Sequence, residues 1–247
     1  MKKTKEPRII FFDIETTPMK TFRFQYDRNP YINHNDIIED WYIVCAAWQV
    51  LGEKKVHSVA ITKLGDDKQV VKALRDALAT ADVIMGHCID RFDIRNLQAR
   101  MVYHRITPLP NIPTLDTLKM ARKIGGFTSN KLDYLAKKLL GAGKIKTDGD
   151  LWRQVTSGSK KALKDMVEYN KVDVIRNVEV YNVLRPYMPN HPHIGVMKGL
   201  GKNESCPNCG SLELKKNGIR PTKGGILKQE VQCKKCGSYH RIPVVKV

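Results

Sequence analysis

The stretch RIIFFDIETTP, residues 8–18, decides the fold class of this protein. Its apolar run at residues 9–12 is rich in isoleucine and phenylalanine, which predicts a short buried β-strand. The strand delivers Asp13 and Glu15, and because they are two residues apart their side chains point to the same face. Two carboxylates held side by side repel each other unless a cation lies between them. A bare DxE pattern also fits two solvated residues at a strand end, so the pair needs support from elsewhere.

Alternating strand and helix patterns follow this first strand. Apolar, β-branched composition predicts strands over residues 42–50, 56–61 and 83–85. Helical spacing of apolar residues predicts helices over residues 70–78, 92–101, 115–124, 132–140 and 160–184. We expect Asp66 and Asp67 to cap the first helix and Pro186 to end the last. Antiparallel-looking strands first and helix-crossed strands later predict the α/β class, with a mixed sheet flanked by helices.

Two further motifs carry acidic residues. In VIMGHCIDRFDIRNL, residues 83–97, an apolar strand passes through Gly86 and reaches Asp93 near the start of a helix. An acidic residue there can simply cap the helix, and the same holds for Asp90. In VEYNKVDVIRN, residues 167–177, Tyr169 and Asp173 are four apart on the long helix and therefore share one face. Taken alone, such a pair is ordinary on an exposed or core-edge helix face.

The order of the motifs is more informative than any one of them. DIET at residues 13–16, GHCIDRFD at residues 86–93 and YNKVD at residues 169–173 follow one another along the chain. In this order they resemble the DEDD exonucleases, and within them the tyrosine-bearing DEDDy branch, because Glu168 stands where the other branch carries histidine. The similarity covers residues 8–186 and is greatest to the proofreading exonuclease domains of family B DNA polymerases and their stand-alone relatives.

The resemblance implies an RNase H-like fold and a complete catalytic set. It makes Asp13, Glu15, Asp93 and Asp173 the ligands of two divalent ions, with Asp13 bridging both ions. Tyr169 would orient or help to deprotonate the attacking water. Oxygen ligands suit Mg²⁺ or Mn²⁺, and two such ions about 3.5–4 Å apart can activate a water and stabilise a leaving oxygen. The implied activity is 3′-to-5′ hydrolysis of phosphodiester bonds, in single-stranded DNA, releasing mononucleotides.

Cys88 departs from the family pattern, which commonly has asparagine five residues before the aspartate of the second motif. A thiol donates and accepts hydrogen bonds weakly, so we expect altered contacts to the terminal nucleotide while the metal ligands are untouched. We do not expect Cys88 to act as a nucleophile. Asp116, in TLDTLK, is interpreted as a helix cap, with a supporting role beside the metal ligands as the alternative.

Four of the six cysteines form two matched pairs. Cys206 and Cys209 lie in CPNCG, Cys233 and Cys236 lie in CKKCG, and 23 residues separate the pairs. Thiolates at this spacing close a tetrahedral Zn²⁺ site without an open position, and the glycine after each pair permits a tight turn. The module resembles a zinc ribbon, with LELKK, LKQEVQ and RIPVVKV as its strands. A redox dithiol, or His240 as a substitute ligand, has less support because the four cysteines complete a site.

The charge of the chain favours a polyanionic partner. Lys and Arg number 43 against 25 Asp and Glu, which gives a formal net charge of +18. Residues 198–247 alone carry eleven Lys or Arg against three Asp or Glu. Such an excess favours nucleic acid as the partner, and a basic protein without one is the alternative. The resemblance favours DNA over RNA and makes a polymerase or another replication or repair protein a candidate partner.

The sequence predicts a cytoplasmic protein of two modules. Its first apolar run is too short for a signal-peptide core, and no segment is apolar enough to span a bilayer. Residues 187–203 contain prolines and glycines with little periodicity, which predicts a linker between an exonuclease domain at 1–186 and a zinc ribbon at 204–247. The alternatives to a DNA exonuclease are a 3′-to-5′ exoribonuclease on the same fold and a non-catalytic nucleic-acid-binding protein.

Overall fold

A computed structural model of the chain describes residues 6–22, 32–142 and 149–244. Its main sheet has the strand order β5-β4-β1-β6-β7. These strands are β1 (Ile9–Thr16), β4 (Ile43–Val50), β5 (Val56–Ala60), β6 (Val83–Gly86) and β7 (Thr114–Asp116). β1 is antiparallel to β4 and parallel to β6. The outer pairs repeat this division, since β4 and β5 are antiparallel whereas β6 and β7 are parallel. The predicted mixed sheet is confirmed.

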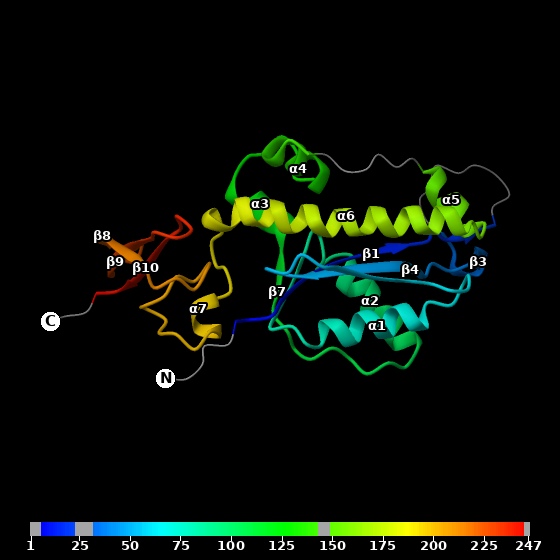
Figure 1. Ribbon diagram of the computed structural model, residues 1–247, viewed down its shortest axis with the longest axis horizontal. Helices are drawn as coiled ribbons and strands as arrows, with labels where there is room; N and C mark the ends of the chain where they lie inside the picture. The colour runs from blue at the N-terminus through cyan, green and yellow to red at the C-terminus, as the bar shows by residue number, and fades with distance from the viewer. Residues whose placement is uncertain (1–5, 23–31, 143–148, 245–247) are drawn as a thin grey trace.

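Helices cover both faces of this sheet. They are α1 (Lys68–Leu78), α2 (Asp93–Tyr103), α3 (Thr117–Ile124), α4 (Leu132–Leu140), α5 (Asp150–Thr156), α6 (Lys160–Leu184) and α7 (Ile194–Met197), with 3-10 turns at His34–Asp36 and Arg185–Tyr187. Figure 1 shows α6 along one face of the sheet, with α4 and α5 on that side, and α1 and α2 against the other face. The fold is therefore a mixed sheet between two helical layers, as the sequence predicted.

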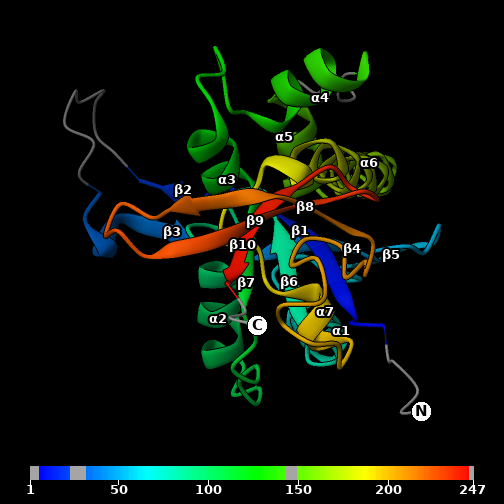
Figure 2. The same ribbon diagram turned by 90° about the vertical axis from the view of Figure 1, so that its left-hand side faces the viewer.

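Two smaller sheets complete the described chain. β2 (Lys20–Thr21) pairs with β3 (Ile37–Glu39). β8 (Leu214–Pro221), β9 (Leu227–Cys233) and β10 (Tyr239–Pro243) form an antiparallel sheet in the order β10-β9-β8. Figure 1 shows this sheet beyond the C-terminal end of α6, at the opposite end of the molecule from β3, and Figure 2 views it from that side. Three strands were expected in the cysteine-rich module and three are present, although β8 begins at Leu214 and β10 ends at Pro243. Residues 245–247 of the expected strand RIPVVKV lie outside the described part of the chain.

Alternation along β1 decides which side of the sheet receives its carboxylates. Ile10 and Phe12 belong to the apolar cluster that includes residues of α1 and α2. Ile9 and Phe11 belong to the cluster that includes the C-terminal half of α6, where the ring of Phe11 meets that of Tyr181 with centroids 5.1 Å apart. Because side chains alternate along a strand, Asp13 and Glu15 continue the second series and face α6.

Most predicted elements are confirmed, and the bounds of α6 agree with the prediction at both ends. β1 is longer than expected, so its two carboxylates lie within the strand and not after it. Asp66 accepts a hydrogen bond of 3.2 Å from the backbone N–H of Lys68, the first residue of α1, but the N-cap residue is Asp67. The prediction for Asp67 is wrong, because its side chain makes no cap hydrogen bond and instead accepts two bonds of 2.7 Å from Arg100. A buried guanidinium is a stronger partner than a helix end.

The segment predicted as a linker is packed against the main domain. Met188 and Ile194 are buried in the apolar cluster beneath α6. His191 lies within it as well, with its Nε2 atom 2.9 Å from the Tyr181 hydroxyl. Residues 187–203 thus hold the last module in place through buried contacts. Among the described residues, no helix has the length and apolar composition needed to cross a membrane.

Candidate active site and metal centre

Carboxylates from two distant segments meet between β1 and α6. Asp13 and Glu15 project from β1, and Asp173 projects from the middle of α6. One carboxylate oxygen from each of the three lies within 4.8 Å of the others. Packing of the long helix over the sheet creates this group, because neither segment could place all three side chains alone.

Asp93 approaches the same place from the start of α2. Its carboxylate is buried, and its Oδ1 atom accepts a hydrogen bond of 3.2 Å from the backbone N–H of Ile14. Burial raises the pKa of Asp93 to about 7, although the Ile14 hydrogen bond acts in the opposite direction. Asp93 lies outside the closest three-carboxylate group but lines the same cavity of about 430 Å³ as Asp13, Glu15 and Asp173.

Tyr169 lines this cavity too, one helical turn before Asp173. Its ring meets Trp152 of α5 edge to face, with centroids 6.1 Å apart and an interplanar angle of 76°. The sequence did not predict α5, a helix of only seven residues. It contributes Val155 to the apolar core and places Trp152 against the tyrosine ring, which restricts the position of that ring.

Asn170 is the site residue that sequence reasoning missed. Its Nδ2 atom donates a hydrogen bond of 2.6 Å to Oδ2 of Asp13, and the residue has 0% exposure. Its Oδ1 atom is buried without a hydrogen-bond partner among the described residues. The amide nitrogen must face the carboxylate, since an amide oxygen would repel it. The available signal was an asparagine on the inward stripe of α6, directly after Tyr169.

The loop between β6 and α2 requires two unusual backbone positions. A Cβ atom on Gly86 would lie 1.9 Å from Cγ2 of Ile89 and 2.9 Å from the Phe12 carbonyl oxygen, so β6 can end close to β1 only at glycine. Cys88 has a φ of 72°, which is uncommon for a residue with a side chain. Burial raises the pKa of the Cys88 thiol, which favours the protonated form and disfavours a nucleophilic role.

Asp116 holds this loop in addition to capping α3. Its side chain accepts from the backbone N–H groups of Leu118 and Lys119, so the predicted cap is confirmed. The same carboxylate accepts a hydrogen bond of 3.0 Å from the backbone N–H of Cys88. Asp90 does not cap a helix; it accepts from the Thr114 hydroxyl and pairs with Lys119 at 2.7 Å.

A larger cavity, of about 610 Å³, adjoins the carboxylates. It shares Asp13, Asp173, His87 and Cys88 with the first cavity. The ring of His87 is fixed between two partners, the Thr117 hydroxyl at 3.0 Å and the Asn130 carbonyl oxygen at 2.9 Å. The remaining lining residues belong to α3, to the segment before α4 and to the first turn of α4: Leu118, Arg122, Thr128, Ser129, Asn130, Lys131, Leu132 and Asp133.

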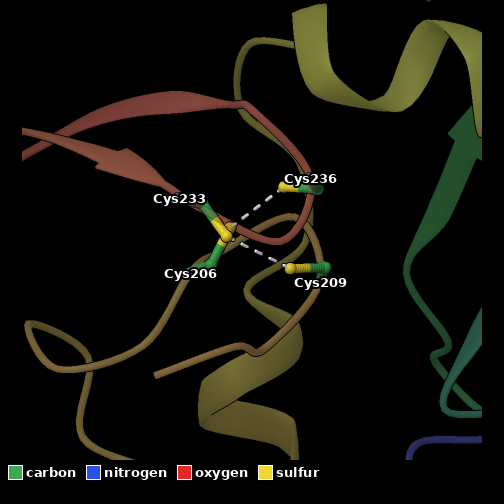
Figure 3. A group of neighbouring side chains, drawn as sticks. All are labelled: Cys206, Cys209, Cys233 and Cys236. Carbon is green, nitrogen blue, oxygen red and sulfur yellow. Dashed lines mark hydrogen bonds between the residues drawn. The ribbon is translucent and has the colours of Figure 1, made fainter. Parts of the chain in front are cut away.

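The four paired cysteines form a second candidate metal centre. Figure 3 shows their side chains pointing toward one another from two loops. All four sulfur atoms lie within 4.8 Å of each other, and Cys206–Cys236 and Cys209–Cys233 are both separated by 3.6 Å between sulfurs. A disulfide would need about 2.05 Å, whereas a tetrahedral zinc site with 2.3 Å bonds has sulfur separations of about 3.8 Å. The geometry fits zinc.

The two cysteine loops have the same backbone structure. Gly210 and Gly237 adopt φ values of 73° and 80°, and each donates its N–H to the carbonyl oxygen of the first cysteine in its pair. A hydrogen bond from the Cys209 thiol lowers the pKa of Cys206 to about 4, while the pKa of Cys209 is raised because the pair shares its proton. A thiolate, the form that binds metal, is therefore favoured at Cys206.

The first loop is attached to the main domain. Nδ2 of Asn208, between the cysteines, donates a hydrogen bond of 2.6 Å to the Arg185 carbonyl oxygen just after α6. The backbone N–H of Ile194 bonds the Pro207 carbonyl oxygen at 2.8 Å. The cysteine module is thereby connected to the same helix that carries Tyr169 and Asp173.

Comparison with known proteins agrees with this architecture. The family model of the RNase_H superfamily matches residues 32–185. The structure of the family B DNA polymerase from the hyperthermophilic archaeon Pyrobaculum calidifontis is similar over 78% of this chain, with 15% identity and a TM-score of 0.56. The match covers 26% of that polymerase chain, and at this identity it shows the fold alone. No curated protein matches the chain.

Proposed function

The chain belongs to the RNase_H superfamily, and from this premise we propose that it is a metal-dependent 3′-to-5′ exonuclease acting on single-stranded DNA. The observation that carries the proposal is one cavity lined by four acidic residues and a tyrosine: Asp13, Glu15, Asp93, Tyr169 and Asp173. Since β1 lies outside the matched residues 32–185, the assignment of Asp13 and Glu15 rests on this geometry and on the DIET motif.

In this proposal the four carboxylates hold two Mg²⁺ or Mn²⁺ ions. Carboxylate oxygens are the ligands that these ions prefer, and the closest three already lie within 4.8 Å of one another. When bound, the ions activate a water and stabilise the leaving oxygen of the displaced phosphodiester. Asn170 orients the Asp13 carboxylate, the backbone of Ile14 orients that of Asp93, and Tyr169 positions the attacking water.

The cavity of about 610 Å³ receives the end of the strand. It opens directly beside Asp13 and Asp173, so a phosphate at its inner end can reach the carboxylates. Arg122 and Lys131 supply cations that neutralise the backbone without lying among the metal ligands. Cys88 lies where the resemblance expects asparagine, and its thiol gives the terminal nucleotide a weaker partner.

The cysteine module is proposed to bind one structural zinc ion. Four cysteines leave no open ligand position, so the module contributes to substrate engagement and takes no part in the chemistry. We accordingly divide the chain into an exonuclease domain at 1–186, a connecting segment at 187–203 and a zinc ribbon at 204–247. Proofreading or repair beside a separate polymerase is the context that the family resemblance favours.

Digestion of end-labelled strands tests the proposed activity. A 5′-labelled single-stranded DNA should shorten to a ladder from its 3′ end, releasing mononucleotides, when Mg²⁺ or Mn²⁺ is added to metal-depleted buffer. An identical strand with a blocked 3′ end and a free 5′ end should resist. Equal digestion of the blocked strand would exclude 3′-to-5′ polarity. The matched RNA strand, assayed side by side, decides the substrate, because faster RNA cleavage would assign an exoribonuclease.

A further inference from the structure

The register of the β8–β9–β10 sheet separates its side chains into two chemically different faces. Residues directly opposite each other in antiparallel strands project to the same face. Lys215 pairs with Gln232, and Gln232 with Tyr239; Arg220 pairs with Lys228; Glu230 pairs with Arg241. Lys228, Glu230 and Gln232 occupy alternate positions of β9, so they and their partners on β8 and β10 share one face. We call it the basic face, and its residues are Lys215, Arg220, Lys228, Glu230, Gln232, Tyr239 and Arg241.

The opposite face carries a single lysine, Lys216, and is partly covered where it approaches the cysteines. Lys216 pairs with Val231, and Val231 with His240. Val231 is buried at 1% exposure, and both ring nitrogens of His240 are shielded from solvent. Leu214, which pairs with Cys233, packs on the cysteine cluster. This face is therefore directed toward the metal centre, and the basic face is directed away from it.

The basic face combines cations with an exposed aromatic ring. It carries four Lys or Arg against a single acid, Glu230, which is paired with Arg220 at 3.1 Å. Tyr239 is 56% exposed. Gln232 of β9 pairs with Tyr239 on one side and with Lys215 on the other, so the three side chains lie side by side across the sheet. Proteins bind single strands through this combination of cations that contact the backbone and an exposed ring that stacks on a base.

We propose that the basic face of the ribbon is a binding platform for single-stranded nucleic acid, in which Tyr239 stacks on a base while Lys215, Lys228 and Arg241 contact the flanking phosphates. The inference rests on the proposed exonuclease function, since it identifies the bound strand with the substrate. α6 connects the two regions: Leu184 ends the helix 11 residues after Asp173, or about 17 Å along the axis at 1.5 Å per residue. On a strand whose 3′ end lies at the carboxylates, the platform would bind nucleotides on the 5′ side of the one being removed.

Adjacent lysines provide the decisive comparison. Lys215 and Lys216 are consecutive, both exposed and equal in charge, but they project to opposite faces. Binding is measured by fluorescence anisotropy of a 5′-labelled single-stranded oligonucleotide, with the full chain carrying Asp173→Ala to prevent cleavage. Lys215→Ala should weaken binding several-fold and reduce the salt slope by about 0.7, the value for one phosphate contact on a single strand. Lys216→Ala should leave the affinity and the salt slope equal, within experimental error, to those of the parent protein.

Tyr239→Ala tests the stacking step. Loss of one base–aromatic stack should weaken binding about tenfold without changing the salt slope. The same variant should bind an oligonucleotide with abasic sites as well as the parent does, because no base remains to stack. Tyr239→Phe should restore binding to the base-bearing strand, since the ring is retained.

Three results would overturn the platform. Equal losses of affinity for Lys215→Ala and Lys216→Ala would show that only overall charge matters. An unchanged affinity for all the basic-face variants would indicate that this face binds a protein partner and not nucleic acid. An equal effect of Tyr239→Ala on abasic and base-bearing strands would exclude stacking.

Cleavage by the same ribbon variants in the chain with Asp173 intact is a separate readout. Absence of cleavage with any strand would reject the exonuclease function even if the platform binds, whereas normal cleavage with unaltered binding would reject only the platform.

Discussion

The two candidate metal centres are constructed in opposite ways. The carboxylate centre draws its residues from β1, α2 and α6, and these elements pack around the large apolar clusters of the main domain. The cysteine centre draws its ligands from two short loops, and its apolar cluster consists of the cysteines themselves with Leu214. One centre is held in shape by the fold around it, whereas the other supplies the core on which its own fold depends.

This difference predicts different consequences of removing a ligand. In the carboxylate centre the protein fold places like charges together, so a bound ion would relieve repulsion while the surrounding fold sets the shape of the site. In the ribbon a bound metal would have to provide much of the free energy of folding, because so small a core cannot offset the chain entropy. Loss of a carboxylate should therefore abolish chemistry and spare the fold, and loss of a cysteine should do the reverse.

The largest expected effect is that of Asp173→Ala on turnover. Removing one carboxylate leaves the ions without a ligand from α6, so single-turnover cleavage should fall by orders of magnitude while circular dichroism and strand binding stay close to the parent values. Asp13→Ala should behave in the same way. Asp165→Ala is the matched control, because Asp165 is an exposed aspartate of the same helix and should leave cleavage unchanged. Normal cleavage by either ligand variant would refute the metal assignment.

Tyr169→Phe should have the next largest effect. The phenyl ring preserves the edge-to-face contact with Trp152, so only the hydroxyl is lost. A group that positions the attacking water contributes about 10²–10⁴-fold, and single-turnover rates should fall within that range while metal and strand binding persist. Tyr103→Phe, at an exposed tyrosine of α2, is the control. Rates near those of the parent would mean that Tyr169 serves only to pack against α5.

The sequence predicted which acidic residues lie together better than it predicted their surroundings, since all the proposed ligands line one cavity. Asp13, Glu15, Asp93, Tyr169 and Asp173 were proposed because three short motifs occur in the order that resembles the DEDDy exonucleases, and such motifs can be read from the sequence alone. The contact between Asn170 and Asp13 depends on how α6 lies over the sheet, and no local pattern contains that information.

Short elements and buried polar residues were missed for the same reason. β7 has three residues, too few to show a period, and it forms only because β6 offers it a partner. Asp67 follows the pattern of a helix cap, but Arg100 of α2 provides a partner that only the packed structure brings near. The residues 187–203 are irregular in sequence and nevertheless buried in part, since tertiary packing can fix a segment that has no period.

Asn170→Ala should change the metal requirement more than the fold. A hydrogen bond to a charged group contributes about 1.5–3 kcal/mol, so losing the bond of Asn170 to Asp13 should raise the Mg²⁺ concentration for half-maximal cleavage at least about tenfold. Asn177→Ala is a close control, because Asn177 is also buried on α6 but accepts its bond from the Thr117 hydroxyl. Both variants should lose some thermal stability, and only Asn170→Ala should shift the Mg²⁺ titration. If the Mg²⁺ titrations of the Asn170→Ala and Asn177→Ala variants were identical, Asn170 would contribute only to packing.

The smallest expected effect on turnover is that of Cys233→Ser, and it is the sharpest test of the contrast between the centres. Zinc content should fall from one ion per chain to none, and limited proteolysis should cut within residues 204–244, because the metal-free ribbon cannot remain folded. Cleavage at saturating substrate should nevertheless stay within about twofold of the parent, since the carboxylate cavity is complete without the ribbon. Cys45→Ala is the control, because Cys45 is buried in β4 and lies outside the cysteine cluster, so this variant should still contain one zinc ion per chain. A collapse of turnover in step with zinc loss would instead mean that the hydrogen bond from Asn208 to Arg185 and the contacts around it hold α6 in its catalytic position.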